Sequence, residues 1–250
     1  MTSVLAVVWA LCMRDLLRFV RDRSQVLGAA ARPLLWLVFL GAGMHRAFTT
    51  ELGVGYGEFL LPGVVAMSLL FGGLFTSVTV IWDREFGFMK ELAVAPIPRW
   101  SIVAGKIASG TLVTVLQGAI VLAFAPVASI DLPLAAIAPL LGLMTLTSVA
   151  VVALGLCIAS RMRTFEGFGA LANFVVLPLF FLSGSMYPLR DVPPYLAPLV
   201  TANPITYAVD AMRGVTLGRS VHSVAVDVAV LVAFAAATTG GAVALFRVSR

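Results

Sequence analysis

The amino-acid sequence predicts an all-α integral membrane protein, and three observations support that fold class. Of the 250 residues, 60% are hydrophobic and 12% are charged, whereas a typical globular domain is about 45–50% apolar and about 25% charged. The mean hydropathy is +1.03. Six apolar stretches approach or exceed the roughly 20 residues that a helix needs to cross a bilayer. These features exclude a soluble enzyme, a disordered chain and a disulfide scaffold.

The first predicted element, residues 4–23, is an amphipathic helix that lies in the membrane interface. Its basic side carries Arg14, Arg18 and Arg21 with Asp22, and its apolar side carries Leu5, Val8, Trp9, Cys12, Leu16 and Val20. Both sets recur at helical spacing. A basic face opposite an apolar face with an early tryptophan is typical of interfacial helices. The alternative is a solvated helix docked on a partner.

Six transmembrane helices follow this element. Their predicted ranges are 27–44, 59–82, 102–127, 132–159, 168–187 and 224–246. Arg32 and Pro33 lie near the start of the first span, where the arginine can extend to the headgroups. Glu58 and Asp227 are interpreted as interfacial. The chain has no internal repeat and no Gly/Ser-rich linker, so residues 1–250 are predicted to form one transmembrane domain.

The distribution of basic residues predicts the orientation of the chain. With the N-terminus in the cytoplasm, the cytoplasmic side holds Arg14, Arg18, Arg21, Arg23, Arg32, Arg84, Lys90, Arg99, Lys106, Arg161, Arg163, Arg247 and Arg250. The outer side holds Arg46, Arg190, Arg213 and Arg219. Cytoplasmic loops of membrane proteins collect Lys and Arg. Both termini are therefore predicted to be cytoplasmic, and the net charge of +5 is attributed to topology rather than to nucleic-acid binding.

The cytoplasmic connection, residues 83–101, is longer than a simple linker needs to be. Acidic and basic side chains alternate there with Phe86, Phe88, Met89 and Leu92, and Pro96 and Pro98 then stop any helix. Apolar anchors within a charged rim predict a short amphipathic helix presented to a soluble partner. The alternative is a helix that lies on lipid headgroups.

The outer connection, residues 188–223, stays apolar although five prolines interrupt it, at positions 188, 193, 194, 198 and 204. Such a composition favours broken helices that re-enter the outer leaflet between the fifth and sixth spans, where they must be buried in protein or line a cavity. The alternative is a compact outer cap with no role in transport.

The sequence contains no recognisable catalytic, cofactor-binding or metal-binding constellation. It has no HExxH or GxSxG motif, and Gly105-Lys106 is no P-loop because Trp100 and Ile107 replace the required glycine and hydroxyl residue. Cys12 and Cys157 are expected to be free thiols. His45 and His222 are interpreted as isolated, without metal-ligand partners. Spans nearly free of ionisable groups also argue against an ion path.

Four segments, taken in order, resemble a known family. They are Asp83-Arg84-Glu85-Phe86-Gly87 with Leu92 and Pro96, then Gly105-Lys106, then Phe181–Pro188 (FLSGSMYP), and finally Asn203–Arg213 (NPITYAVDAMR). With the N-terminal helix and the six spans, this order resembles the type-2 ATP-binding-cassette (ABC) exporter permeases, in particular the daunorubicin-resistance and nodulation-factor branch. The chain departs from the pattern where Phe86 and Phe88 flank Gly87.

The resemblance implies a transport subunit that is not itself an enzyme. It implies two six-span permease subunits, identical or related, with two cytoplasmic ATPase chains that carry ATP and magnesium, in a bacterial inner membrane. The residues implied in ATPase coupling are Asp83, Arg84, Glu85, Phe86, Gly87, Phe88, Met89, Lys90, Glu91, Leu92 and Pro96. The candidates for the substrate path are Phe71, Phe75, Asn173, Phe180, Phe181, Ser183, Ser185 and Tyr187.

The predicted function is ATP-driven export of an amphiphile, such as a drug, a lipid or a lipid-linked glycan. Two alternatives stay open at this point. One is a secondary carrier or channel that works without ATP, and the other is a membrane-embedded transferase. A neighbouring gene for a P-loop protein would favour the exporter.

Overall fold

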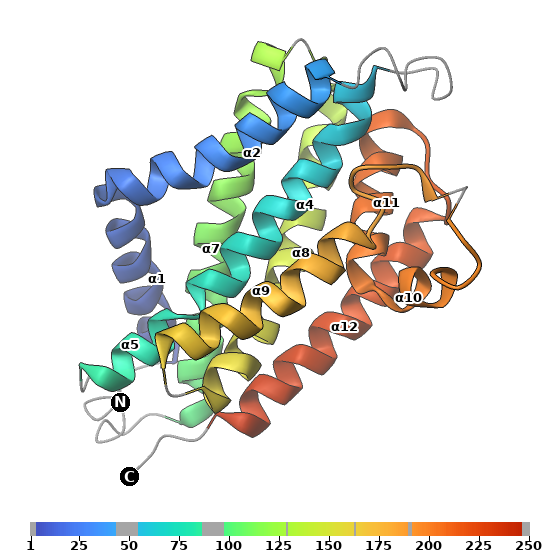
Figure 1. Cartoon of the computed structure of the whole chain (residues 1–250). Helices are drawn as coiled ribbons and strands as arrows, with labels where there is room; N and C mark the ends of the chain where they lie inside the picture. Colours follow the sequence, from blue (N-terminus) through green and yellow to red (C-terminus); the bar gives the residue numbers. More distant parts are fainter. Residues whose placement is uncertain are drawn as a thin grey trace.

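A computed structural model describes residues 4–43, 55–86, 98–128, 130–162, 164–189 and 192–246, and Figure 1 shows their arrangement. These residues form helices and turns, without a β-strand among them. The helices are α1 (Val4–Arg21), α2 (Arg23–Gly43), α4 (Tyr56–Thr76), α5 (Thr79–Glu85), α7 (Arg99–Ala123), α8 (Leu134–Arg161), α9 (Phe165–Phe181), α10 (Ala197–Ala202), α11 (Pro204–Leu217) and α12 (Val224–Leu245), with a 3-10 turn η1 (Ala125–Ala128). The all-α membrane fold class is confirmed.

Five helical segments are long and apolar enough to cross a membrane: Arg23–Gly41, Tyr56–Glu85, Trp100–Ala123, Leu134–Arg161 and Val224–Leu245. A sixth apolar helix, α9, has 17 residues, which corresponds to a rise of about 25 Å. It ends at Phe181 rather than at the predicted residue 187. The chain turns there, and Gly184 adopts a φ of +70°, which favours glycine.

Helix α4 is the centre of the bundle and packs against α2, α7, α8, α9 and α11. Most of its side chains are buried. The second predicted span, 59–82, is broken after Thr76 and resumes as α5 at Thr79. The break is held by the Ser77 hydroxyl, which donates to the carbonyl oxygens of Gly73 at 3.3 Å and Val152 at 3.1 Å. Helix α8 can approach this point closely because residue 155 is glycine, and a Cβ there would overlap Ser77.

Helices α1 and α2 meet at a sharp angle beside the bundle (Figure 1). Helix α1 buries Leu11, Asp15 and Phe19 and packs against α7, so it docks within its own chain. Leu5 and Trp9, on its predicted apolar side, stay exposed. Cys12, also on α1, and Cys157 on α8 are free thiols, as predicted.

The segment between the last two spans forms α10, which is mostly exposed and packs against α11, and α11, which packs into the bundle. Helix α11 packs against α4, α8, α9 and α12, and its residues Ile205–Arg213 are mostly buried. Asn203 caps it, because its side chain accepts a hydrogen bond from the Ile205 amide at 3.0 Å. Gly218 ends it with a φ of +66°. The predicted short helices between the last two spans are therefore present, and each has a proline in its first turn; their re-entry into the outer leaflet stays a prediction.

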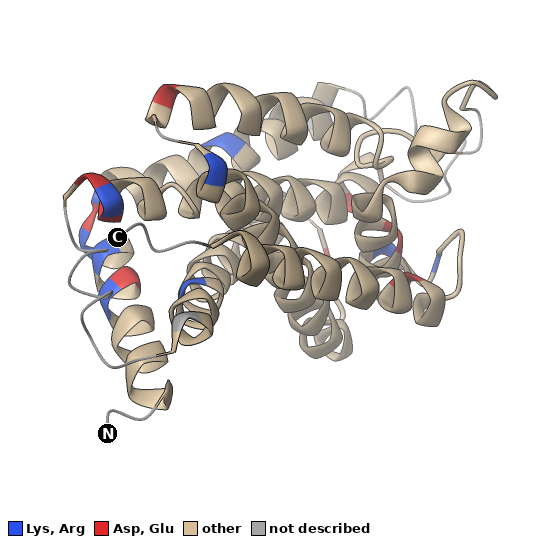
Figure 2. Cartoon of the chain, turned by 90° about the horizontal axis from the view of Figure 1, so that it is seen from below, with Lys and Arg blue, Asp and Glu red and all other residues tan. Residues whose placement is uncertain are grey.

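Charged residues are concentrated at the ends of the helices. Figure 2 shows one group towards the end of the molecule where the chain termini lie and another around α11, with long uncharged stretches of helix between them. The helices at the edge of the bundle expose apolar side chains, among them Leu35 and Phe39 on α2 and Phe174 on α9. An uncharged middle with apolar outer faces is the surface that a lipid bilayer requires.

Candidate functional site

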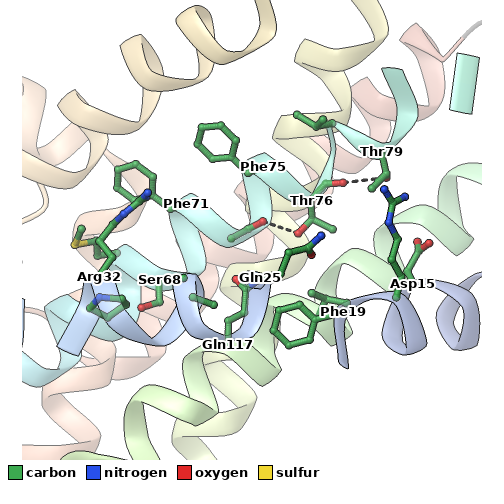
Figure 3. A pocket seen from close by; sticks show the side chains of 18 of the residues that line it. Asp15, Phe19, Gln25, Arg32, Ser68, Phe71, Phe75, Thr76, Thr79 and Gln117 are labelled. Atoms are coloured by element: carbon green, nitrogen blue, oxygen red, sulfur yellow. Dashed lines mark hydrogen bonds between the residues drawn. The ribbon is translucent and has the colours of Figure 1, made fainter. Parts of the chain in front are cut away.

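A cavity of about 430 Å³ opens between the N-terminal helices and the central bundle. Its lining comes from α1, α2, α4, α5, α7 and the first residue of α9, as Figure 3 shows. Helix α4 supplies one wall from Met67 to Thr76, and α2 supplies another from Gln25 to Pro33. This volume is within the range of small-molecule binding sites, which is about 300–1,000 Å³.

Aromatic rings and two arginines give the cavity an amphiphilic character. Phe71 and Phe75 stack on α4 with parallel rings whose centroids are 6.4 Å apart. The guanidinium group of Arg32 lies 5.1 Å from the centroid of the Phe71 ring, and that of Arg18 lies 4.7 Å from the Trp82 ring. Cation–π contacts hold each arginine against an aromatic wall. The cavity therefore combines an apolar surface with two fixed positive charges.

Gln117 on α7 adds a neutral polar group to the same cavity. It approaches α4 at Gly72, where a Cβ would overlap its side-chain oxygen. Glycine at position 72 therefore makes room for the amide. Ser68, one helical turn earlier on α4, also lines the cavity, and its hydroxyl donates to the Val64 carbonyl at 2.9 Å.

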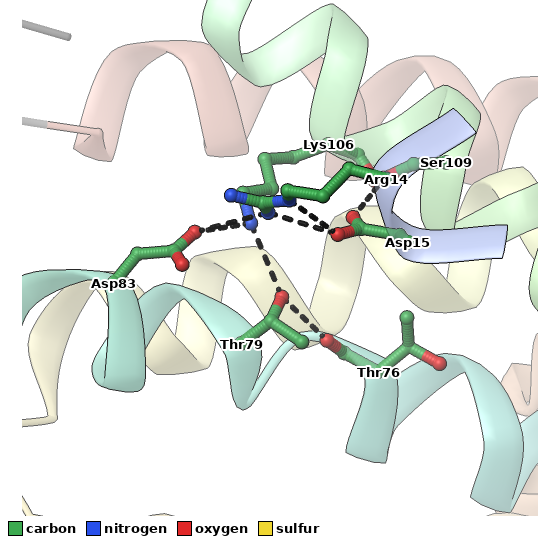
Figure 4. Close-up of polar contacts among 7 residues, drawn as sticks. All are labelled: Arg14, Asp15, Thr76, Thr79, Asp83, Lys106 and Ser109. Carbon is green, nitrogen blue, oxygen red and sulfur yellow. Dashed lines mark hydrogen bonds and ion pairs between the residues drawn. The ribbon is translucent and has the colours of Figure 1, made fainter. Parts of the chain in front are cut away.

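A buried ion-pair cluster joins three helices next to this cavity (Figure 4). Lys106 on α7 is only 3% exposed, and its ammonium group donates to the Asp83 carboxylate on α5. Arg14 on α1 lies 3.4 Å from the same carboxylate and 2.8 Å from Asp15. The Ser109 hydroxyl on α7 donates to Asp15 at 2.8 Å. Each buried charge in this cluster has an opposite charge beside it, as burial in a low-dielectric environment requires.

The ion-pair cluster and the cavity share two residues. Asp15 and Thr79 both line the cavity, and the Thr79 hydroxyl lies 3.3 Å from the Lys106 ammonium group. A displacement of α5 would therefore act on both α1 and the cavity wall.

The predicted coupling residues divide into three groups. Asp83 belongs to the ion-pair cluster, and Arg84 donates to carbonyl oxygens of Ala159, Ser160 and Met162 at 3.3–3.5 Å, which caps the end of α8. Glu85 and Phe86 are exposed at the end of α5. Gly87, Phe88, Met89, Lys90, Glu91, Leu92 and Pro96 lie outside the described residues.

The predicted substrate-path residues do not form one surface. Phe71 and Phe75 line the cavity, whereas Phe180 is buried with its ring edge-on to Trp36. Phe181 is exposed on α9. Asn173 is exposed, with its amide donating to the Gly169 carbonyl. The Tyr187 hydroxyl donates to the carbonyl of Phe181 at 2.8 Å.

Ser183 and Ser185 lie in a hydrogen-bonded turn that follows α9, not within a span. Their hydroxyls are buried and hydrogen-bonded to each other. Arg213, buried on α11, donates to the carbonyls of Gly184 at 2.7 Å and Ser185 at 3.3 Å, and stacks 3.7 Å from the Phe59 ring centroid. The placement of both serines within the fifth span is therefore corrected: they lie in the turn that Arg213 ties to α4 and α11.

One interpretation at the outer connection is wrong. His222 is not isolated, because its Nδ1 lies 3.3 Å from Asp210 and 3.8 Å from Asp227. Asp227 lies in the first turn of α12, at the end of the predicted span, and its side chain is fully buried within the protein. Asp210 and His222 are twelve positions apart, and only the turn between α11 and α12 brings them together.

Sequence reasoning missed the ion-pair cluster and the two cavity arginines. A signal for the cluster was present: Lys106 falls inside the predicted third span, and a buried ammonium group requires an acidic partner. Asp83, at the end of the preceding span, was the nearest acidic residue in a span-end position. The cavity arginines had no such signal, because the meeting of α1 and α2 with α4 depends on tertiary packing.

Comparison of the sequence with known proteins shows which family the chain belongs to. The model of the family described as "ABC-2 type transporter" matches residues 6–217. The chain is 28% identical over 233 residues to the inner membrane transport permease YadH of Escherichia coli K12, covering 91% of this chain and 88% of that protein. It is 30% identical over 221 residues to the ycf38 protein of Porphyra purpurea, covering 84% and 74%. It is 24% identical over 210 residues to nodulation protein J of Rhizobium leguminosarum bv. viciae, covering 83% and 81%.

Proposed function

Because the chain belongs to the ABC-2 type transporter family, we propose that this transport permease is the membrane subunit of an ATP-driven exporter for amphiphiles. The observation that carries the proposal is the cavity beside α4. Its aromatic wall is suited to an apolar chain or ring system, and Arg18 and Arg32 are suited to an anionic or strongly polar headgroup. A drug, a lipid or a lipid-linked glycan combines these two parts.

The energy source in this proposal is a separate pair of ATPase chains that bind ATP and magnesium. The sequence of the permease supports this division, because Gly105-Lys106 lacks the surrounding P-loop residues. The Lys106 side chain, moreover, is engaged with Asp83 inside the bundle. Two copies of the permease, or this chain with a related one, complete the proposed transporter.

Coupling in this proposal passes through the end of α5. Glu85 and Phe86 are exposed at the end of α5, directly before residues 87–97 of the predicted coupling segment. Asp83, one turn earlier, contacts α7 through Lys106 and α1 through Arg14. Movement of an ATPase against this end would therefore be transmitted to α1, which forms part of the cavity wall.

The cellular setting of the proposal is the inner membrane, with both termini in the cytoplasm. The excess of basic residues on one side of the predicted spans supports this orientation. The start of α1 and the end of α12 lie towards the same end of the molecule (Figure 1), as an even number of crossings requires.

Reconstitution tests the proposed function. The permease is co-purified with a P-loop ATPase encoded beside its gene and placed in proteoliposomes, and a panel of amphiphiles is assayed for stimulated ATP hydrolysis and for transport. We expect ATP-dependent transport that is lost when the P-loop lysine of the ATPase is replaced. Transport that proceeds without nucleotide and follows an ion gradient would overturn the proposal and favour a secondary carrier.

A further inference from the structure

At the opposite end of the bundle from the ion-pair cluster, three potential metal ligands converge where α11 meets α12. They are Asp210 on α11, His222 in the turn and Asp227 in the first turn of α12. One ligand atom from each lies within 4.8 Å of the other two. We propose that these three side chains bind a divalent transition-metal ion. This site is independent of the proposed transport function.

The distances suit a small ion. Nδ1 of His222 is 3.3 Å from an oxygen of Asp210 and 3.8 Å from an oxygen of Asp227. Zinc bonds of about 2.0–2.1 Å in tetrahedral geometry place ligand atoms about 3.4 Å apart. A small shift of one carboxylate therefore brings all three ligands to bonding distance of a common centre.

The state of Asp227 is the observation that points to a ligand. The residue is fully buried, and neither of its carboxylate oxygens has a hydrogen-bond partner among the residues that the structure describes. An uncompensated buried carboxylate is costly. Its Oδ1 is directed at His222, yet at 3.8 Å it is beyond hydrogen-bonding distance. A cation held between the two would supply the missing partner.

Asp210 is held in place from the other side. Its two oxygens accept hydrogen bonds from the backbone amides of Val221, at 2.8 and 2.9 Å, and of His222, at 2.8 Å. Metal-ligating carboxylates usually carry supporting hydrogen bonds of this kind. The contacts also fix the turn that carries His222, so both ligands are positioned before an ion arrives.

The donor set and its exposure indicate which ion fits. One imidazole nitrogen with two carboxylates suits zinc and neighbouring transition metals, whereas magnesium and calcium prefer oxygen donors alone. The His222 side chain is 37% exposed, so an ion can reach the imidazole from outside the protein. Arg213, the arginine of α11, donates to the carbonyls of Gly184 and Ser185 and also interacts electrostatically with Asp210.

Metal titration of the full chain tests the site. The protein is purified in detergent with a histidine-free tag, and Zn²⁺ binding is measured by calorimetry and by the Zn²⁺-dependent rise in melting temperature. Co²⁺ serves as a spectroscopic probe of the ligand set. We expect one ion per chain for the wild type. His222→Gln and Asp227→Asn should each weaken binding by about tenfold or more and abolish the rise in melting temperature.

His45→Gln is the matched control, because it removes the other histidine of the chain, and it should bind as the wild type does. If Asp227→Asn fails to fold, the test rests on His222→Gln alone, because His222 is partly exposed and its substitution should not unfold the protein. Absence of Zn²⁺ and Co²⁺ binding to the wild type would overturn the proposal. So would unchanged binding in His222→Gln, or binding that is lost in His45→Gln.

Discussion

At the scale of single residues, buried charges of this protein join helices that are distant in the sequence. Lys106 and Asp83 pair between α7 and α5, and Arg213 ties α11 to the turn after α9 through main-chain carbonyls. Each side chain is surrounded by apolar helices, where a lost partner leaves a charge without solvent. These positions are therefore the ones at which a conservative substitution should have a large effect.

The pairing of Asp83 predicts a specific loss of stability. Asp83→Asn leaves the buried Lys106 ammonium group without a carboxylate, and breaking a buried pair in this way costs about 3–5 kcal/mol. Glu85→Gln, two positions away on the same helix but exposed, should change stability by no more than about 0.5 kcal/mol. Unfolding of the detergent-solubilised chain measures both values.

The double variant Asp83→Asn/Lys106→Met should recover part of the lost stability, because neither buried charge of the pair then remains without its partner. If Asp83→Asn and Glu85→Gln are equally stable, the ion-pair cluster does not have the energetic role assigned to it.

The position of Arg32 in the cavity predicts that its substitution weakens substrate binding. Arg32→Gln removes a fixed positive charge from the cavity while its neighbours on α2 remain, so the KM for an anionic amphiphile should rise about tenfold, equivalent to about 1.4 kcal/mol. The maximal rate of stimulated ATP hydrolysis should change little. Arg23→Gln is the control, because Arg23 starts the same helix but does not line the cavity. An equal effect in both variants would contradict the role of the cavity in substrate binding.

At the scale of elements, α5 is a short helix that follows the central helix α4 and directly precedes the predicted coupling segment. The break at Ser77 and Val78 separates it from α4. Its polar contacts include Asp83 to Lys106 on α7, Asp83 to Arg14 on α1, and Arg84 to the end of α8. An element with its own hinge and contacts to three helices can pass a displacement to each of them.

The exposed tip of α5 predicts an interface with the ATPase. Phe86 is 83% exposed, and aromatic anchors of this kind often contribute more than 1 kcal/mol to an interface. Phe86→Ala should weaken ATPase binding about fivefold or more and lower substrate-stimulated hydrolysis. Phe174→Ala is the matched control, because that phenylalanine is also exposed but lies on the apolar helix α9, away from α5 in the sequence. Co-purification yield and the Kd of the complex measure the difference. Unchanged binding in Phe86→Ala would contradict the coupling assignment.

At the scale of the whole molecule, the positions of the charged residues imply one orientation in the membrane. The end of α5 and the turn after α11 lie at opposite ends of the bundle (Figure 1), and Arg219 in that turn is exposed. Because Lys and Arg accumulate on the cytoplasmic side, the α5 end should face the cytoplasm and the α11 turn should face outward.

Cysteine labelling in whole cells measures this orientation. In a background without Cys12 and Cys157, Arg219→Cys should react with a membrane-impermeant maleimide added from outside. Glu85→Cys should react only after the membrane is permeabilised. The reverse pattern would invert the topology and place α5 out of reach of any cytoplasmic ATPase.

The sequence by itself determined the fold class, the approximate spans, a helix at the N-terminus and proline-interrupted helices between the last two spans. These features depend on local properties, since crossing a bilayer requires an uninterrupted apolar stretch and prolines interrupt helices wherever they occur. The resemblance to exporter permeases also rested on local segments kept in order along the chain.

Only the tertiary structure decided which distant residues meet. Asp15 reaches Ser109 across 94 positions and Arg213 reaches Phe59 across 154, and neither spacing is visible in a periodic pattern. The cavity, the division of the predicted path residues and the contacts of His222 likewise follow from how α1, α2, α11 and α12 pack on α4 and α8. Helix packing in lipid depends on complementary surfaces and paired polar groups, and these are properties of two elements together.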